Sequence, residues 1–238
     1  MAAEKAAEER ARKRRLLTLA GIAAAAVAAV VAIVLLAGGD DEPAGGESTT
    51  AEAQSLFDGI AQSGTSLGDP NAKVVLTEYA DLQCPFCADY ATKVLPELVD
   101  KYVRPGKLRL ELRLLTFLGP DSERGANAAY AAADENRMWQ FVDGWYRNQG
   151  TENSGYGDDG FITELADEAG FSAERATAAA RNGSEFKPIE KAQGEAELHG
   201  IDSTPSFLVG PRGGEGERIE VSELTFAAFE EALAPYLE

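Results

Sequence analysis

The feature that most constrains this chain is a pair of cysteines, Cys84 and Cys87, the only two among its 238 residues. An apolar run typical of a buried strand, Val74–Ala80, precedes them, and a helical pattern follows. Pro85 suits the first turn of that helix, where a missing N–H costs nothing. Two thiols at this spacing can close a small disulfide, and the unpaired N–H groups and dipole of a helix N-terminus favour the thiolate of the first. The spacing therefore predicts a redox dithiol at a strand-to-helix turn.

Two other roles for the cysteines fit the sequence less well. A structural disulfide usually joins distant segments, because the unfolded-state entropy that it removes grows with loop length, and this loop is short. A zinc site needs two further ligands, and the chain offers only one histidine, His199, and no third cysteine. We therefore expect no metal at Cys84 and Cys87.

The first part of the chain is predicted to be a membrane anchor. Residues 1–15 hold six Lys/Arg and end in a basic cluster, whereas residues 16–38 hold no charge. As a helix, at about 1.5 Å per residue, the apolar stretch is long enough to cross a bilayer, and the charges before it predict a cytoplasmic N-terminus. The alternative is a cleaved signal peptide, whose apolar core is usually shorter. Residues 39–67, rich in Gly, Asp, Glu, Ser and Thr, are predicted to be a flexible linker to a domain at 68–238.

The charge of the chain argues against nucleic acid as a partner. Residues 39–238 hold 16 basic and 37 acidic residues, a formal net charge of −21, and such a surface repels phosphate. We interpret the acidity as a solubility trait. The membrane is expected as a partner only through residues 16–38.

The domain begins as strand, redox turn, helix and strand. Pro96 lies inside the first helix, which extends to about Lys101, and should kink or split it. Leu108 to Leu115 alternates apolar and charged residues, which predicts a second strand with one buried face. From about 121 to 199 the sequence is helical only. We therefore predict an α/β fold with an inserted all-helical subdomain.

The predicted helices of the insertion are Ser122–Glu135, Met138–Asn148, Phe161–Ala169, Ala173–Arg181 and Phe186–Leu198. Their aromatic residues fall at helical spacing, which favours core packing over a cofactor site. Two short strands follow, Ser206–Val209 and Arg218–Val221. A last amphipathic helix is expected at Leu224–Leu237, with Ser222 as its N-cap.

Taken together, these motifs resemble the DsbA-like thiol–disulfide oxidoreductases of the thioredoxin superfamily, in the membrane-anchored form of Gram-positive and actinobacterial envelopes. The motifs that carry the resemblance are Asp69-Pro70-Asn71-Ala72, Glu78-Tyr79-Ala80-Asp81, Cys84-Pro85-Phe86-Cys87, the helical insertion and Ser203-Thr204-Pro205. The resemblance covers residues 68–238 and implies a thioredoxin-like fold.

The resemblance also implies a role for each matching position. Cys84 corresponds to the exposed nucleophile, and Cys87 to the buried resolving cysteine. Thr204 and Pro205 correspond to a cis-proline loop that offers its backbone to an extended substrate. Glu78 corresponds to an acidic residue beneath the site that helps to move the proton of the resolving thiol; the alternative is an ordinary strand carboxylate.

The sequence departs from the family between the cysteines, where the best-known members carry a basic or polar residue and this chain carries Phe86. A phenyl group adds no charge that would stabilise the Cys84 thiolate, and Asp81 and Asp89, if close, would raise its pKa. We therefore predict a Cys84 pKa below that of a free thiol but a less extreme oxidant than the strongest family members. We expect His199 to be a surface or helix-end residue.

The function that we predict is disulfide formation in exported proteins by dithiol–disulfide exchange outside the cytoplasmic membrane. No prosthetic group is expected, because the Cys84–Cys87 pair is itself the redox centre. Apolar residues at Phe86 and the Pro205 loop suit an unfolded polypeptide, and a quinone-linked membrane protein is the expected recycling partner. Two alternatives remain open: a reductase or isomerase with the same site, and a membrane-tethered binding module with an inert disulfide.

Overall fold

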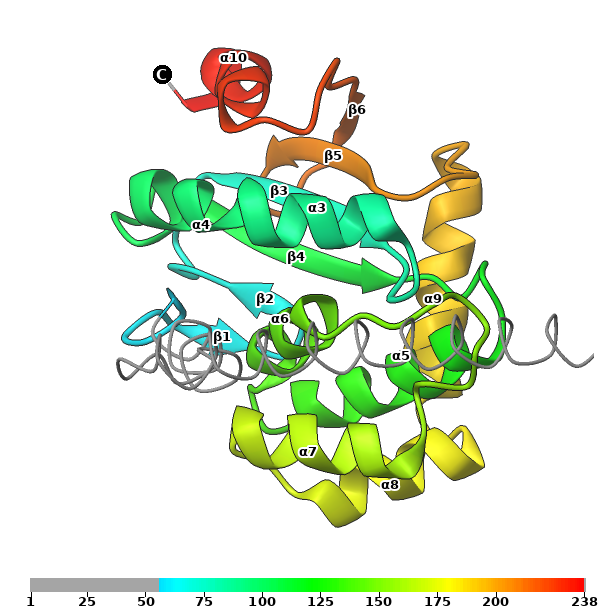
Figure 1. Cartoon of the computed structure of the whole chain (residues 1–238). Coiled ribbons are helices and arrows are strands. Elements are labelled where there is room, and N and C mark those ends of the chain that lie inside the picture. The colour runs from blue at the N-terminus through cyan, green and yellow to red at the C-terminus, as the bar shows by residue number, and fades with distance from the viewer. Residues whose placement is uncertain (1–55, 238) are drawn as a thin grey trace, which may run out of the picture. The chain divides into compact units, whose positions relative to one another are not determined.

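A six-stranded sheet with the order β1-β2-β4-β3-β5-β6 forms the centre of residues 56–237, the part of the chain that the computed structural model describes (Figure 1). β3 and β4 run parallel, and the other neighbouring strands run antiparallel. The strands are β1 (Gln62–Ser63), β2 (Ser66–Leu67), β3 (Val74–Ala80), β4 (Leu108–Leu114), β5 (Ser206–Pro211) and β6 (Glu217–Ile219). The first strand and the alternating second strand predicted from the sequence are thus confirmed as β3 and β4.

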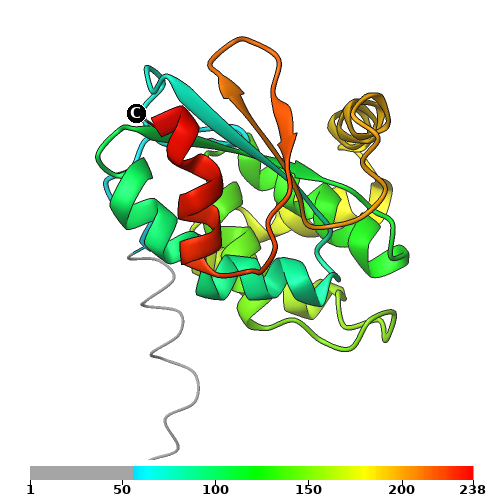
Figure 2. The same cartoon turned by 90° about the horizontal axis from the view of Figure 1, so that it is seen from above.

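Helices cover the two faces of the sheet unequally. α3 (Pro85–Lys93) and α10 (Phe226–Leu237) lie on one face, and α9 (Phe186–Leu198) lies on the other (Figure 2). On the first face the ring of Phe207 contacts those of Tyr90 and Phe229, each pair of centroids 4.8 Å apart. On the second face Tyr79 and Leu208 join a smaller buried cluster with residues of α9.

The helix after the cysteines is divided, as Pro96 predicts. α3 ends at Lys93, and α4 (Leu95–Leu98) and the π-helix η1 (Val99–Val103) follow it. Proline has no N–H to donate to the carbonyl four residues back, so the helix cannot continue unchanged through this point. The break leaves α3 as a short helix whose N-terminus carries the dithiol.

The helical insertion is confirmed, and most of its buried apolar residues belong to the same hydrophobic cluster as the sheet and α3. It comprises α5 (Pro120–Ala133), α6 (Met138–Arg147), α7 (Asp159–Ala169), α8 (Ala173–Asn182) and α9. Trp145 of α6 packs against Phe141, Tyr156 and Phe161, with ring centroids 5.0 to 6.0 Å apart. The aromatic residues at helical spacing therefore serve core packing, as expected.

The linker predicted for residues 39–67 is wrong over its last part. Phe57 is buried, β1 and β2 pair with each other, and β2 extends the sheet beside β4. Arg104 also holds this segment, because its guanidinium donates to the carbonyl oxygens of Leu56 and Asp58 at 2.8 and 2.9 Å. Two-residue strands are too short to show an alternation in the sequence, so no periodic pattern marks the start of the domain before residue 68.

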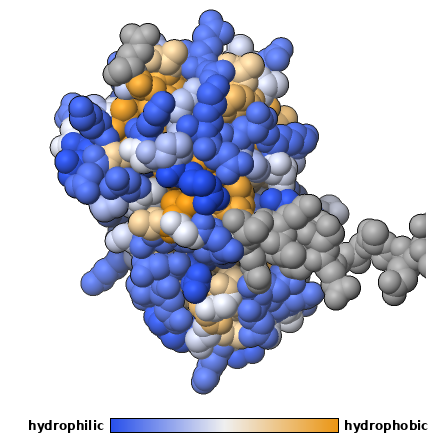
Figure 3. Space-filling view, turned by 90° about the vertical axis from the view of Figure 1, so that its left-hand side faces the viewer, coloured by the Kyte–Doolittle hydropathy of each residue, from blue (hydrophilic) through white to orange (hydrophobic). Residues whose placement is uncertain are grey.

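The predicted tail at 1–15, the anchor at 16–38 and residues 39–55 of the linker lie outside the described residues. Within 56–237, no helix combines the length and the apolar character that crossing a membrane requires. The face at the left of Figure 1 is shown in Figure 3, where hydrophilic side chains cover most of the surface and apolar groups lie between them.

The C-terminal elements differ slightly from the prediction. β6 is shorter than the strand expected at Arg218–Val221. α10 begins at Phe226, and Ser222 is not its cap; the hydroxyl of Thr225 accepts the hydrogen bond from the N–H of Ala228 at 3.4 Å. A Ser or Thr can cap a helix equally, so the composition did not decide between the two positions.

Candidate active site

The dithiol lies at the N-terminus of α3, directly beyond the end of β3. Cys84 is the N-cap residue and Pro85 follows in the first turn, as the sequence predicts. Both cysteines are free thiols, and both are buried, with exposed fractions of 4% for Cys84 and 0% for Cys87. The expectation that Cys84 is exposed is therefore wrong.

The loop before β5 covers Cys84 and explains its burial. The Cys84 thiol donates to the carbonyl oxygen of Thr204 at 3.3 Å, and the Thr204–Pro205 peptide bond is cis. The two segments are 120 residues apart in the sequence but meet because β5 pairs with β3, with Tyr79 opposite Ser206. The half-buried Thr204 and Pro205 thus form one wall of the site.

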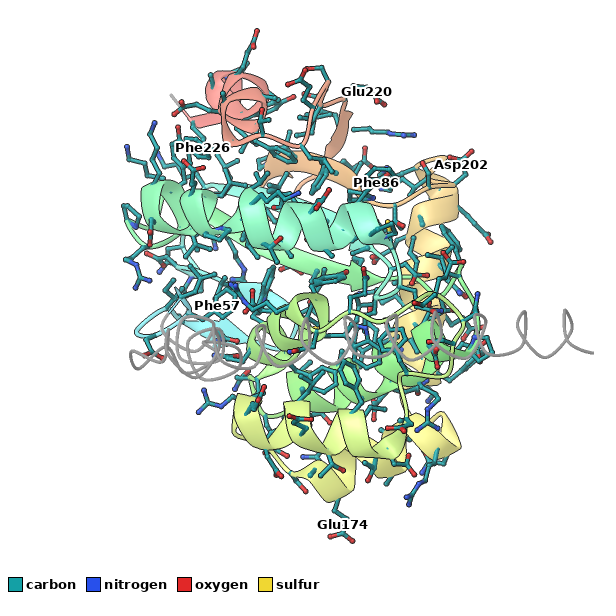
Figure 4. The ribbon with its side chains drawn as sticks, viewed as in Figure 1. Phe57, Phe86, Glu174, Asp202, Glu220 and Phe226 are labelled. Carbon is teal, nitrogen blue, oxygen red and sulfur yellow. The ribbon has the colours of Figure 1, made fainter. Side chains whose placement is uncertain are left out.

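Phe86 presents its ring to solvent beside the dithiol. Its side chain is 61% exposed, whereas the neighbouring Cys87 is fully buried. Figure 4 shows Phe86 at the end of α3, at the same end of the molecule as Asp202 in the loop that leads to Pro205. An exposed ring next to a buried pair of thiols gives the site an apolar rim.

Hydrogen bonds stabilise the thiolate of Cys84. The largest effect comes from the thiol of Cys87, and the side chain of Thr204 and the backbone N–H groups of α3 add to it. Against the opposing effect of burial, they lower the pKa of Cys84 from 9.0 to about 6. The predicted direction is confirmed, and the thiolate is the main form at neutral pH.

The two acidic neighbours do not act on Cys84 as the sequence suggested. The Asp81 carboxylate accepts hydrogen bonds from the hydroxyl of Ser122 at 2.5 Å and from the backbone N–H of Leu118 at 3.1 Å. Asp89 pairs with Lys93 at 2.6 Å on the outer side of α3. Neither is among the groups that shift the Cys84 pKa.

Cys87 has the opposite electrostatic character. Burial raises its pKa well above the ordinary value, and the hydrogen bond to Cys84 and the charge of Glu78 add to the effect. One thiol is thus ionised and the other protonated at neutral pH, because the two share a hydrogen bond that favours the Cys84 anion.

Glu78 lies beneath the dithiol on the face of β3 that α3 covers. It is 5% exposed, and no described residue makes a hydrogen bond to its Oε1 atom. Burial, with a smaller contribution from the Cys84 charge, raises its pKa to about 8. The carboxyl group is therefore mostly protonated at neutral pH, which suits it to exchange a proton near pH 8.

A family model described as thioredoxin matches residues 61–230. The chain belongs to the thioredoxin family. Over 86 residues it is 38% identical to the probable disulfide bond formation protein D of Bacillus cereus, a match that covers 35% of this chain and 40% of the relative. The chain thus spans less than half of the length of this curated relative.

Solved structures show the same fold in DsbA-like proteins. BdbD from Bacillus subtilis, in its oxidised form, superposes with a TM-score of 0.65 at 18% identity, over 75% of this chain and 97% of BdbD. MdbA from Corynebacterium diphtheriae, a thiol–disulfide oxidoreductase, superposes with a TM-score of 0.54 at 24% identity, over 68% and 88% of the two chains. The resemblance to DsbA-like proteins is confirmed at the level of the fold.

In this thioredoxin-family protein the helical insertion fixes the loop that carries Cys84. The side-chain amide of Gln149 donates to the carbonyl oxygens of Leu82 and Cys84 at 2.8 and 3.2 Å. The phenol of Tyr146 donates to the carbonyl oxygen of Asp81 at 3.2 Å. These contacts join segments more than 60 residues apart in the sequence, so no local motif predicts them.

Two buried tyrosines complete the floor of the site. Burial raises the pKa of both Tyr90 and Tyr146 well above the ordinary value, and the charge of Glu78 adds to it in each case. Glu78 therefore has two neutral phenols among its buried neighbours, besides the two cysteines. Tyr146 is one of the aromatic residues of the insertion for which the sequence predicts core packing.

Proposed function

We propose that this protein is a thiol–disulfide oxidoreductase that forms disulfides in exported proteins. The observation that carries the proposal is the difference in acidity between the two thiols: the pKa of Cys84 is about 6, and that of Cys87 is raised. A purely structural disulfide does not require different pKa values for its two thiols. The match to a disulfide bond formation protein supports the same reading.

The reaction begins with the oxidised Cys84–Cys87 pair. A substrate thiolate attacks the Cys84 sulfur, the bond between the two cysteines breaks, and its electron pair goes to Cys87. A second substrate thiolate then attacks the substrate sulfur of the mixed disulfide, and Cys84 leaves as a thiolate. The substrate loses two electrons and gains a disulfide, and Cys84 and Cys87 end reduced.

The low pKa of Cys84 favours this direction. A thiolate with a low pKa is a good leaving group, and stabilising the reduced form makes the dithiol a stronger oxidant. A reductase or isomerase remains the alternative reading of the same chemistry. An inert binding module is the less favoured reading, because it gives no reason for a stabilised Cys84 thiolate.

Glu78 is proposed to exchange a proton with Cys87. The Cys87 thiolate that forms in the first step is buried and needs a proton, and the protonated carboxyl group of Glu78 is the acid beneath it. Its pKa of about 8 allows it to give up and regain a proton under physiological conditions. Glu78→Gln should therefore slow the steps that protonate or deprotonate Cys87.

Phe86 and the loop of Thr204 and Pro205 are proposed to hold the substrate. The exposed ring of Phe86 suits apolar side chains of an unfolded chain, and the loop beside Cys84 offers backbone groups to an extended segment.

The site is proposed to work outside the cytoplasmic membrane, tethered by residues 16–38 with residues 1–15 on the cytoplasmic side. The apolar stretch and the basic cluster before it support this orientation. A quinone-linked membrane protein is the proposed partner that reoxidises Cys84 and Cys87, and the cysteines need no prosthetic group.

The test is oxidation of a reduced two-cysteine peptide by the oxidised full chain. Wild type should oxidise it stoichiometrically, whereas Cys84→Ser and Cys87→Ala, which cannot form the Cys84–Cys87 disulfide, should not. Phe86→Ala should weaken peptide binding several-fold, whereas Phe186→Ala, which removes an equally exposed ring (61% for both) from α9, should not. If both single cysteine variants matched wild type, the enzyme proposal would fail.

A further inference from the structure

A pocket of about 490 Å³ lies on the face of the sheet opposite the dithiol. Its walls are formed by β3, β4 and β5 on this face of the sheet, by the hairpin turn after β5, and by α9. α9 covers this face near the C-terminal end of β3, where Tyr79 belongs to the smaller buried cluster. Nearer the start of β3, Val75 and Thr77 are only half-buried. The thioredoxin-type sheet thus leaves part of this face open, with the hairpin and α9 on either side (Figure 2).

Arg109 is the unusual residue of this pocket. Its side chain is only 18% exposed, and its closest carboxylate oxygen, on Glu111, is 3.6 Å from Nε. The Nε atom is buried and has no hydrogen-bond partner among the described residues. A buried guanidinium N–H without an acceptor is costly, and a small turn of the Arg109 head group toward the pocket would let its N–H groups reach the oxygens of a bound anion.

The carboxylates next to Arg109 already have partners. Glu111 accepts hydrogen bonds from the hydroxyl of Ser66 at 2.6 Å and from Arg113 at 2.9 Å. Glu195 of α9 accepts from Arg113 at 2.9 Å and lies 3.5 Å from Lys191. The negative charge of this wall is therefore neutralised, and Arg109 remains the group with unused donors.

The mouth of the pocket carries two further charges, on the hairpin turn. Arg212 is exposed and makes no ion pair with any described residue. Its backbone N–H donates to the backbone carbonyl oxygen of Lys73 at 2.9 Å. Glu215 lies on the same turn, and its negative charge would repel an anion bound in the pocket. The floor between the charged groups is apolar and comes from Val75 and Leu208.

We propose that this pocket binds a small organic anion, a carboxylate or phosphate carried on an apolar group, with Arg109 as its main ligand. The planar fork of a guanidinium matches the paired oxygens of both anions. The apolar part of the ligand would cover Val75 and Leu208. A pocket of a few hundred Å³ with an apolar floor and a few polar groups is the usual form of a small-molecule site.

The site is independent of the dithiol. Arg109 pairs in register with Val75, near the start of β3, whereas Cys84 lies beyond the other end of that strand. Val75 also points to the face opposite Glu78, because successive residues of a strand alternate between faces. Failure of one proposal therefore leaves the other standing.

The test is calorimetric titration of the full chain with phenyl phosphate, benzoate and inorganic phosphate. We expect saturable binding of phenyl phosphate or benzoate with a Kd of about 1 mM or tighter, and weaker binding of inorganic phosphate, which lacks the apolar part. Arg109→Gln should weaken the binding at least tenfold, and Arg109→Lys should weaken it less. Arg175→Gln, which removes a paired surface charge far along the chain on α8, should leave it unchanged.

Glu215→Gln gives a second, opposite readout, because removing its charge should tighten the binding. No saturable binding of either organic anion by wild type overturns the proposal. Equal binding by wild type and Arg109→Gln, or weaker binding by Glu215→Gln, overturns it as well.

Discussion

Replacing Glu78 with glutamine should stabilise the reduced protein at neutral pH and change its stability little at pH 4. Glu78 is 5% exposed, and burial and the Cys84 charge raise its pKa from 4.5 to about 8. In the unfolded chain the carboxyl group ionises near its ordinary pKa. Between the two pKa values the native state therefore holds a proton that the unfolded state has released.

The magnitude follows from proton linkage. A raised carboxyl pKa contributes stability that is fully present below the unfolded pKa and is lost as the pH rises, by about 1.4 kcal/mol per pH unit, until the native pKa is reached. At pH 7, between the ordinary pKa of 4.5 and the native value of about 8, the accumulated loss is about 3 kcal/mol. Glutamine does not ionise, so Glu78→Gln should recover most of this free energy.

The assay is urea unfolding of the reduced full chain at pH 4, 5.5 and 7, with the midpoint and slope compared between variants. Glu111→Gln on the neighbouring strand is the matched control with the opposite sign. Burial acts to raise the pKa of Glu111, but hydrogen bonds from Ser66 and Arg113 outweigh it and lower the pKa. Glu111→Gln should therefore destabilise the protein at pH 7. A Glu78→Gln variant no more stable than wild type at pH 7 would refute the reasoning.

Two further substitutions test the surroundings of the dithiol. Thr204→Val removes a hydroxyl that favours the Cys84 thiolate, so the Cys84 pKa, measured from thiolate absorbance, should rise by about one unit, and an unchanged pKa would contradict this role. Ser122→Ala leaves the fully buried Asp81 carboxylate short of one donor, so the free energy of unfolding should fall by about 1–3 kcal/mol. Ser184→Ala, at an exposed serine, is its control. If the free energy of unfolding fell no more in Ser122→Ala than in Ser184→Ala, the stabilising role of the contact between Ser122 and Asp81 would be contradicted.

The elements with a strong local pattern were predicted closely. β3 and α9 have the predicted bounds, Val74–Ala80 and Phe186–Leu198, because apolar periodicity and flanking turns define both. The placement of the dithiol at a helix N-terminus also follows from local sequence, since Pro85 marks the first turn. Residues 56–67 were missed because their order depends on β4 and Arg104, not on their own pattern.

The direction of a side chain was harder to predict than its position. Asp81 stands three residues before Cys84, and proximity suggested that its charge would oppose the thiolate. In the structure its carboxylate is turned to Ser122, 41 residues later in the sequence, and to the N–H of Gln83. The burial of Cys84 has the same origin, because the loop that covers it lies 120 residues away. Such contacts depend on tertiary structure, which spacing alone does not encode.

The most direct test of the central claim is the equilibrium redox potential of the Cys84–Cys87 pair, measured against glutathione with the full chain. A Cys84 pKa lowered to about 6 stabilises the reduced form at pH 7 and makes the pair an oxidant. We predict a potential between about −180 and −120 mV, the range of proteins that donate disulfides. A potential near −270 mV, that of a reductase such as thioredoxin, would contradict the proposed direction of the reaction.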